Sequence, residues 1–382
     1  MTSVAIIHNH PIHYQHLLFC ELAKRGLDFE LLLVAAFSTN RLEAPVPEDS
    51  EYACSIGDAG SYEGARPAKT ARFIWRSLNR IRPSIVIISG YCDAAAWTAW
   101  FWASLHGVKK ILWSESNVFD HPRHVWRELP KRVFVKGCDC AHVYGTSSRE
   151  YLERLGMPRT SIRTKRAVVD TALFLNAPET KTRRACDAIR LLYCGRLSQE
   201  KNLSSLIRAL AGVRQNKDSP RLRLMLIGSG PLEEALRLQV ENLGIASIVD
   251  FMGWRRQADL PQFFRDSDVL ILPSASEQWG LVVNEAMLSG LPVAVSEQCG
   301  CAVDLVKPEN GWVFSPYDEA GLTALLEKIA DTPRQVLEEM GRVGRSLAAE
   351  YSVENCSKAT MEMVNGILLV SGSHGLPVNA GS

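Results

Sequence analysis

Short apolar runs that alternate with helical patterns place the strongest constraint on how this chain folds. Helical patterns are clearest where leucine and isoleucine follow i, i+3, i+4, i+7 spacing between residues 203 and 210. Parallel strands need a crossover, usually a helix, to bring the chain back to the same end of the sheet. The alternation therefore predicts an α/β protein with parallel sheets. Strands are predicted at residues 3–7, 29–34, 84–88, 110–113, 140–144, 189–193, 222–227, 248–251 and 269–272, and further helices at 14–25, 68–81, 94–105, 280–288 and 353–370.

The length of 382 residues exceeds what one hydrophobic core ordinarily serves, so two domains are expected. The apolar pattern is lost over residues 176–188, which is typical of an interdomain linker. The run at 140–144 is predicted to be the last strand before it. The prediction comprises an N-terminal domain over 1–175, a C-terminal domain over 189–350, a helix over 351–370, a disordered tail over 371–382 and a long variable loop over 38–67.

The net charge argues against nucleic-acid binding driven by overall charge, because the 43 Lys and Arg residues are balanced by 42 Asp and Glu residues. The charge is uneven, however, since residues 121–166 hold eleven Lys or Arg and four Asp or Glu. Such a stretch favours contact with an anionic membrane surface or an anionic acceptor. A solvated helical face explains it equally well.

The ten cysteines show no C-x2-C spacing of a common zinc site, so reduced thiols in a cytoplasmic protein are expected. Neither a signal peptide nor a run of about 18 apolar residues is found, which predicts no membrane-spanning helix. A peripheral position on the cytoplasmic face of a membrane stays open. The aromatic helix at 94–105 is most simply explained by core packing, with contact to lipid as the minority alternative.

Two glutamates, Glu277 and Glu285, stand eight positions apart around a predicted helix start. An apolar run ends at Pro273, and the segment 280–288 has the composition of a buried helix closed by Gly290. Glu277 would lie in the loop before this helix. Glu285 would lie in its second turn, about 8 Å further along the helix axis.

The start of this helix is predicted to bind an anion between two carboxylates. The backbone N–H groups at Trp279, Gly280, Leu281 and Val282 would have no acceptor within the helix. A carboxylate on either side can accept hydrogen bonds from hydroxyl groups. Either glutamate alone would more often be a solvated surface charge. Together they suit a sugar nucleotide, which has a pyrophosphate with polyol groups on both sides.

A second cluster of charge follows the predicted strand at 189–193. The strand ends at Gly195, and Arg196 and Lys201 lie in the short loop after it. This is the edge at which open parallel sheets bind ligands. Two cations there can neutralise a pyrophosphate, although surface charge would be the usual interpretation of either one alone. Asn202 is expected to cap the next helix.

The two segments together resemble the signatures of retaining family 4 glycosyltransferases, also called glycosyltransferase group 1. The first resembles the family's Glu-x7-Glu block, here followed by Gly290-Leu-Pro-Val, and the second resembles its Gly-Arg-Leu-x3-Lys-Asn motif. The resemblance implies the GT-B fold: two facing Rossmann-like domains with a cleft between them, and a C-terminal helix crossing back to the first domain. It also implies that the protein transfers a hexose-type sugar from a nucleotide diphosphate-sugar to an acceptor hydroxyl. The configuration of the sugar would be retained in this transfer. Uridine diphosphate is the commonest donor nucleotide in such enzymes, and no metal or other cofactor is implied.

The resemblance also implies roles for the site residues. Arg196 and Lys201, with Gly195 at the turn, would bind the diphosphate. Glu277 would hold the sugar hydroxyls and Glu285 the ribose hydroxyls. Arg255, after the Phe-Met-Gly-Trp segment, would touch the base or the ribose. No positioned nucleophile is found, so the two glutamates are not expected to form a glycosidase pair.

The N-terminal half departs from the family pattern in two places. His8, His10 and His13 follow the first strand where many relatives have a Gly-Gly turn. A metal there is disfavoured because no carboxylate lies nearby in the sequence, and His13 is expected to face the cleft. Glu115 stands where relatives often have a histidine, and could contact hydroxyls, act as a base, or serve only in capping or a salt bridge. Asp170 is expected to be structural.

Two alternative functions stay open at this point. A sugar-nucleotide 2-epimerase of the same fold would consume donor without an acceptor, although the two motifs disfavour it. A non-catalytic sugar-nucleotide-binding subunit would bind donor without releasing nucleotide. The acceptor, whether a sugar, a lipid-linked molecule or a small molecule, cannot be predicted because it depends on the variable loop over 38–67.

Overall fold

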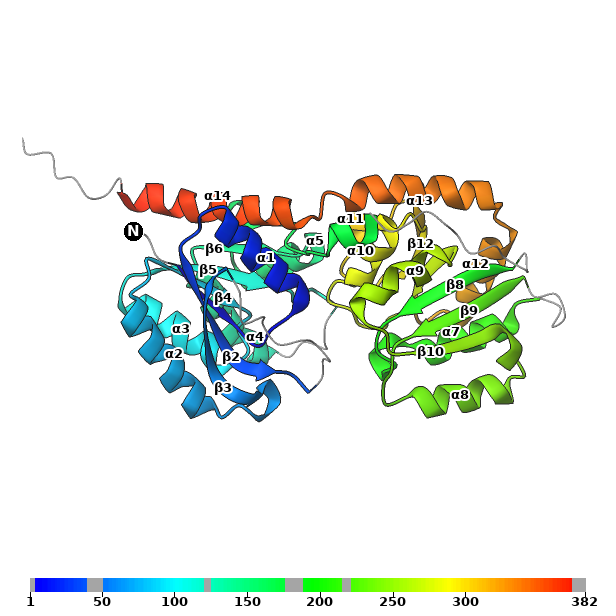
Figure 1. The fold of residues 1–382 in the computed structure, drawn as a ribbon, viewed down its shortest axis with the longest axis horizontal. Helices are drawn as coiled ribbons and strands as arrows, with labels where there is room; N and C mark the ends of the chain where they lie inside the picture. The colour runs from blue at the N-terminus through cyan, green and yellow to red at the C-terminus, as the bar shows by residue number, and fades with distance from the viewer. Residues whose placement is uncertain (1–3, 40–50, 120–124, 176–187, 215–220, 373–382) are drawn as a thin grey trace, which may run out of the picture.

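The computed structural model describes residues 4–39, 51–119, 125–175, 188–214 and 221–372, which form two α/β domains joined end to end (Figure 1). The predicted linker lies outside the described residues except for Ala188. The same holds for the predicted tail beyond Gly372.

The N-terminal domain is built on a parallel sheet with the strand order β3-β2-β1-β4-β5-β6-β7. This order places β1 at the centre with later strands on both sides, as in a Rossmann fold. The strands are β1 Val4–His8, β2 Phe29–Phe37, β3 Ala53–Ser61, β4 Ile85–Ser89, β5 Lys109–Ser114, β6 Cys140–Val143 and β7 Ile162–Arg163. The helices are α1 His13–Lys24, α2 Pro67–Ile81, α3 Ala94–Leu105, α4 Val125–Lys136, α5 Thr146–Leu155 and α6 Thr171–Leu175, with 3-10 turns η1 Tyr62–Gly64 and η2 Arg159–Ser161.

Two sequence predictions for this domain are wrong. The segment 38–67 is not one long loop, because β3 pairs with β2 over Ala53–Ser61. This edge strand has small, half-exposed side chains and is held by its backbone, so it lacks the apolar pattern of a central strand. The run at 140–144 is also not the last strand, since the two-residue β7 pairs with β6 after it.

The C-terminal domain is built on a second parallel sheet, with the order β10-β9-β8-β11-β12-β13. Its strands are β8 Ile189–Cys194, β9 Leu222–Ile227, β10 Val249–Gly253, β11 Val269–Leu272, β12 Val293–Ser296 and β13 Gly311–Phe314, of which the last two were not predicted. The helices are α7 Leu203–Gly212, α8 Glu233–Asn242, α9 Leu260–Arg265, α10 Leu281–Leu288, α11 Ala302–Leu305, α12 Glu319–Asp331 and α13 Arg334–Ala348, with η3 Gln199–Lys201, η4 Ala246–Ile248 and η5 Gln257–Asp259.

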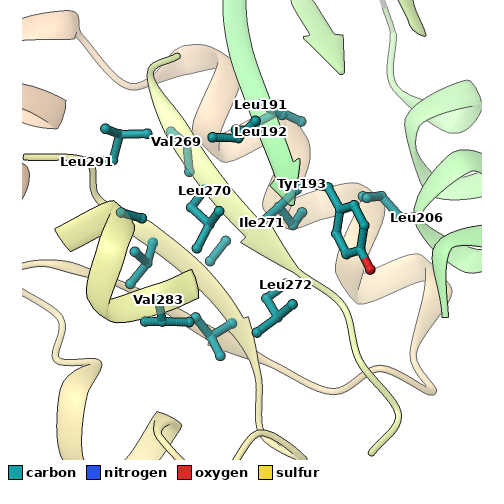
Figure 2. Close-up of a cluster of buried hydrophobic side chains, with 14 of the residues drawn as sticks. Leu191, Leu192, Tyr193, Leu206, Val269, Leu270, Ile271, Leu272, Val283 and Leu291 are labelled. Carbon is teal, nitrogen blue, oxygen red and sulfur yellow. The ribbon is translucent and has the colours of Figure 1, made fainter. Parts of the chain in front are cut away.

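The central strands β8 and β11 hold the core of this domain together. Figure 2 shows side chains of both strands packed beside Val283 of α10. The strand β11 is apolar along its whole length and β8 is apolar except for Arg190, as expected for strands covered by helices on both faces of the sheet. The Tyr193 hydroxyl donates a 2.6 Å hydrogen bond to the Arg196 carbonyl, so the core also fixes the loop after β8.

The C-terminal helix crosses back to the N-terminal domain, as the resemblance implied. This helix, α14 Val353–Gly372, lies along α1 (Figure 1). Its Met363 and Val364 pack in a core cluster with Leu18 and Phe19. The second domain is thereby fastened to the first by a helix as well as by the chain between them.

The aromatic helix at 94–105 packs in the core, which is the simpler of its two predicted explanations. This helix, α3, buries Ala95, Ala99 and Trp102, and Asp93 caps its start by accepting from the Ala96 N–H. Among the described helices, none combines the length and apolar character needed to cross a bilayer.

Candidate functional site

The site residues gather where the strand order of the second sheet changes direction. The strands β8 and β11 are neighbours in the sheet. The chain continues from β8 to β9 on one side of this pair, and from β11 to β12 on the other side. A crevice at the carboxyl ends of such strands is the usual ligand position in this architecture. The loop after β8 holds Gly195, Arg196 and Lys201, and the loop after β11 holds Glu277.

Lys201 and Glu277 meet at this edge of the sheet. The Lys201 ammonium donates to Glu277 Oε2, and the two side chains are 15% and 17% exposed. Glu277 also lies 3.5 Å from the Ser274 hydroxyl. Two residues 76 positions apart in the sequence are thus one ion pair in the fold, with part of each side chain open to solvent.

Arg196 lies beside this pair but is more exposed. Its guanidinium donates a 3.0 Å bond to Glu200, which also accepts a 2.6 Å bond from the Ser198 hydroxyl. The Glu200 carbonyl accepts from the Ala275 N–H at 2.8 Å, which ties the β8 loop to the β11 loop. This role of Glu200 was not predicted, because its partner Ala275 belongs to a distant segment.

Asn202 does not cap α7 as expected. It occupies the N-cap position with φ of 54°, and its side chain accepts no helix N–H. Its amide instead donates to the Pro316 carbonyl at 2.9 Å and accepts from the Ser205 hydroxyl at 2.9 Å. The residue joins the site loop to the segment before α12.

The Gly228-Ser-Gly230 turn after β9 supports the site loop from behind. A Cβ on Gly228 would lie 1.9 Å from the Gly195 carbonyl oxygen, and φ at Gly228 is 130°. A Cβ on Gly230 would lie 2.4 Å from the Leu197 carbonyl oxygen. These glycines let two loops approach each other closely, which is a packing role.

We expect Gly228→Ala to destabilise the C-terminal domain by about 2–5 kcal/mol, because strain at positive φ adds to a backbone clash. Gly253→Ala is the matched control, since Gly253 has φ of 68° and a Cβ added there would meet no atom within 4 Å. The Gly253→Ala substitution should lower the free energy of unfolding by only about 1–2 kcal/mol. Urea unfolding measures both, and equal losses would contradict the packing role.

The predicted anion site at the start of α10 has the expected backbone geometry. Gly280 has φ of 95°, and the helix begins at Leu281, which is half-buried like Val282. The Trp279 side chain is buried, donating to Asn284 Oδ1 at 2.8 Å and packing against Tyr144 and Tyr351. Trp279 could therefore contribute to a ligand site only through its backbone.

Glu285 is the most buried of the predicted site residues with a charge. It is 4% exposed, and the Gln257 amide donates a 2.7 Å bond to its Oε1. Burial raises the pKa of Glu285 to about 7, against opposing effects of the Gln257 bond and of His13. Its carboxyl group therefore keeps its proton to a much higher pH than an exposed glutamate does. Gln257, on η5, was not predicted.

The N-terminal domain faces Glu285 with His13 and Asp170. His13 Nε2 lies 3.8 Å from Asp170 Oδ2, and this contact with His13 lowers the pKa of Asp170. Both residues act electrostatically on Glu285, and α6 packs against α10. His13 thus lies on the cleft side of its domain. The structural role expected of Asp170 is also present, since it accepts from the Leu173 N–H at 3.0 Å.

The other two histidines of the first loop are held by backbone carbonyls. His8 Nδ1 donates to the His10 carbonyl and His10 Nδ1 to the Pro11 carbonyl, both at 3.0 Å. Burial lowers the pKa of His8 to about 4, which favours the neutral ring. Across the part of the chain that the structure describes, no group of three or more His, Cys, Asp or Glu side chains could hold a metal ion.

Glu115 belongs to a charged cluster at the end of β5. Its Oε1 accepts from the Tyr144 hydroxyl at 2.7 Å and from Arg166 Nη2 at 2.8 Å. Arg166 is 1% exposed and lies between the rings of Trp113 and Tyr144. The salt-bridge role that the sequence left open is thus present, while part of Glu115 stays exposed.

Contacts from the N-terminal domain fix the loop that holds Glu277. The buried Asn117 amide donates to the carbonyls of Glu277 and Gln278 at 3.0 and 2.8 Å. Asp304 accepts from the Thr146 N–H and hydroxyl at 2.8 and 2.7 Å, at the start of α5. These residues were missed because their partners are more than 150 positions away.

Arg255 is exposed after β10 and is not brought to the Lys201–Glu277 pair. Its guanidinium lies 5.7 Å from the centre of the Phe263 ring. The neighbouring Trp254 is also largely exposed. A role for Arg255 at the base or ribose stays a prediction.

Comparison with known proteins agrees with this architecture. The family model of glycosyl transferases group 1 matches residues 179–346. A D-inositol 3-phosphate glycosyltransferase of Streptomyces avermitilis is 25% identical over 402 aligned residues, covering 94% of this chain and 85% of that protein. Its counterpart in Streptomyces scabiei is 31% identical over 184 residues, 46% of this chain and only 41% of that protein.

Solved structures show the same fold over nearly the whole chain. The lipopolysaccharide outer core galactosyltransferase WaaB has a TM-score of 0.74 at 17% identity, covering 96% of this chain and 99% of that one. Anabaena HepE in complex with UDP has a TM-score of 0.74 at 18% identity, covering 96% of this chain and all of that one. The chain is thus a two-domain protein with the GT-B fold. The family model of glycosyl transferases group 1 matches most of its C-terminal domain, in agreement with the resemblance to that group, while the retaining family 4 assignment stays a prediction.

Proposed function

We propose that this protein is a retaining glycosyltransferase that moves a hexose-type sugar from a UDP-sugar to an acceptor hydroxyl. The observation that carries the proposal is the meeting of Lys201 and Glu277 at the carboxyl edge of the second sheet, beside the start of α10. A cation and a helix N-terminus at one point favour a diphosphate. The adjacent carboxylate can accept hydrogen bonds from sugar hydroxyls.

The proposed chemistry depends on charge at the departing nucleotide. As the glycosidic bond breaks, the diphosphate gains negative charge. Lys201, Arg196 and the N–H groups of Leu281 and Val282 would stabilise that charge more in the transition state than in the bound donor. These groups supply positive charge from the chain itself, so we propose a reaction that needs no metal ion.

The choice of uridine diphosphate rests on neighbours of the same fold. HepE structures are described with UDP and with UDP-glucose. In this chain, Glu285 would accept hydrogen bonds from the ribose hydroxyls. The Gln257 amide already donates to Oε1 of the same carboxyl group. We propose the same donor class here on that basis.

A panel of nucleotide sugars in a thermal-shift assay tests donor binding, and nucleotide release with candidate acceptors tests transfer. We expect UDP-hexoses to raise Tm and release of UDP to depend on an acceptor. Arg196→Ala should lower turnover at least tenfold, because it removes one of the proposed cations.

Three outcomes would contradict the proposal. Donor consumed without any acceptor would indicate a 2-epimerase, and binding without release across the acceptor panel would indicate a binding subunit. Unchanged turnover in Arg196→Ala would contradict its role in charge neutralisation.

A further inference from the structure

One side of α4 exposes a line of apolar side chains. Trp126, Leu129 and Val133 are 84%, 57% and 52% exposed. Their i, i+3, i+7 spacing places them on one side of the helix. Isolated exposed apolar residues are normal on a protein surface, whereas a continuous line of them indicates a contact surface.

The opposite side of α4 is firmly packed, so this line is not unfinished core. Phe134 and Val135 are fully buried. The Phe134 ring lies 5.1 Å from that of Trp97, and the Trp100 indole donates to the Phe134 carbonyl at 3.0 Å. The helix is held in place by these contacts while its outer side stays open.

Positive charge flanks the apolar line. Arg132 and Lys136 are both exposed, and neither has an ion pair within the described residues. The one carboxylate of the helix, Glu128, accepts from Lys131 at 2.8 Å and from the Tyr151 hydroxyl at 3.0 Å. The outer side of α4 therefore combines apolar and cationic groups.

The chain places this surface at the cleft end of its domain. The helix α4 follows β5 and leads back toward β6, which runs parallel to β5. The first turn of α4, with Trp126, therefore lies nearest the carboxyl edge of the sheet, where β5 is followed by Glu115 and Asn117.

We propose that Trp126, Leu129 and Val133, with Arg132 and Lys136, dock this protein on a bilayer of anionic phospholipid. The apolar side chains would enter the boundary between headgroups and acyl chains, and the two cations would contact lipid phosphates. A second copy of this chain fits less well, because a symmetric contact would bring like charges together. Docking would also set the cleft beside a lipid-borne acceptor, a consequence that rests on the proposed glycosyl transfer.

Flotation with vesicles measures the docking directly. The parent protein should bind phosphatidylglycerol vesicles at least tenfold more tightly than phosphatidylcholine vesicles. Arg132→Gln/Lys136→Gln should weaken that binding about 30-fold, since each basic residue near an anionic surface contributes roughly 1 kcal/mol. Arg214→Gln/Lys358→Gln removes two exposed cations elsewhere and should change it less than threefold.

A matched pair of leucines tests the apolar line. Leu129→Ser should weaken binding to phosphatidylglycerol vesicles at least fivefold, whereas Leu238→Ser, at 58% exposure on α8, should not. Brominated phosphatidylglycerol should quench part of the tryptophan emission of the parent. That quenched part should be lost in Trp126→Phe, because Trp126 is the indole expected to enter the lipid.

The proposal is overturned if the parent binds both vesicle types equally, or if the α4 variants and their controls behave alike. It is also overturned if the parent forms a dimer that Trp126→Ser abolishes, because a second copy would then cover the surface. A UDP thermal shift on the same samples keeps the two proposals separate. Vesicle binding without that shift would support docking and count against the proposed donor.

Discussion

Lys201→Ala is expected to lower kcat by about 10²–10³-fold, the usual cost of removing one group that stabilises developing charge in a transition state. The effect should be larger than for Arg196→Ala, because Lys201 is mostly buried against Glu277 whereas Arg196 is largely exposed. Removing the ammonium would also leave the Glu277 carboxylate uncompensated beside the proposed diphosphate. Nucleotide release with saturating donor and acceptor measures the loss.

Lys109→Ala is the control for this experiment. Lys109 forms a 2.9 Å ion pair with Asp139 at the start of β5, at the opposite end of the strand from the cleft. The Lys109→Ala substitution should leave kcat within a factor of two of the parent value. A Lys201→Ala protein that keeps a third or more of the parent kcat would refute the role assigned to Lys201.

Glu285→Gln is expected to make the protein more stable at pH 8 while weakening its hold on UDP. The folded-state pKa of Glu285 is raised by burial from 4.5 to about 7. Between these values the unfolded chain loses this proton while the folded protein keeps it. The contribution of Glu285 to the stability of the parent therefore falls as the pH rises from about 4.5 to 7, by up to roughly 3 kcal/mol.

The glutamine variant lacks this penalty because its amide does not ionise. Its carbonyl can still accept the bond from Gln257. Its Tm should match that of the parent near pH 4.5 and exceed it by several degrees above pH 7. Thermal unfolding across this pH range measures the difference, and parallel curves for the two proteins would contradict the raised pKa.

The same substitution should raise the Kd for UDP about 10–100-fold, since a hydrogen bond to a charged acceptor contributes roughly 1.5–3 kcal/mol. Affinity of the parent should also rise more steeply between pH 6 and 8 than that of the variant, because only the parent gains a carboxylate there. Glu297→Gln, on the loop after β12, controls for the loss of one acidic side chain. Equal affinity of parent and Glu285→Gln would exclude contact with the ribose.

The sequence predicted most strands of both sheets but missed β3, β7, β12 and β13. A strand such as β11 is buried on both faces, so its apolar run is continuous, and in β8 only Arg190 interrupts the run. The edge strand β3 is held by its backbone against β2, and its half-exposed side chains leave no such pattern. The two-residue β7 is too short to be recognised from periodicity at all.

Local motifs located one half of the candidate site. Arg196, Lys201, Glu277 and Glu285 could be singled out because each lies in a short segment with its own spacing. Contacts such as Asn117 with the Glu277 carbonyl, or Asp304 with Thr146, join the two domains. No spacing in the sequence indicates them, because an amide or a carboxylate can find a partner anywhere along the chain.

The sequence by itself indicated parallel sheets and the residues at the start of α10, because apolar periodicity and helix geometry act over short distances. The GT-B class was implied by the resemblance of two motifs to a known family. The tertiary structure decided how those residues are used. It pairs Lys201 with Glu277, buries Glu285 until its pKa rises to about 7, and binds Glu115 to the enclosed Arg166. Burial and ion pairing depend on which groups meet when distant segments pack, and the spacing of residues along the chain does not fix that.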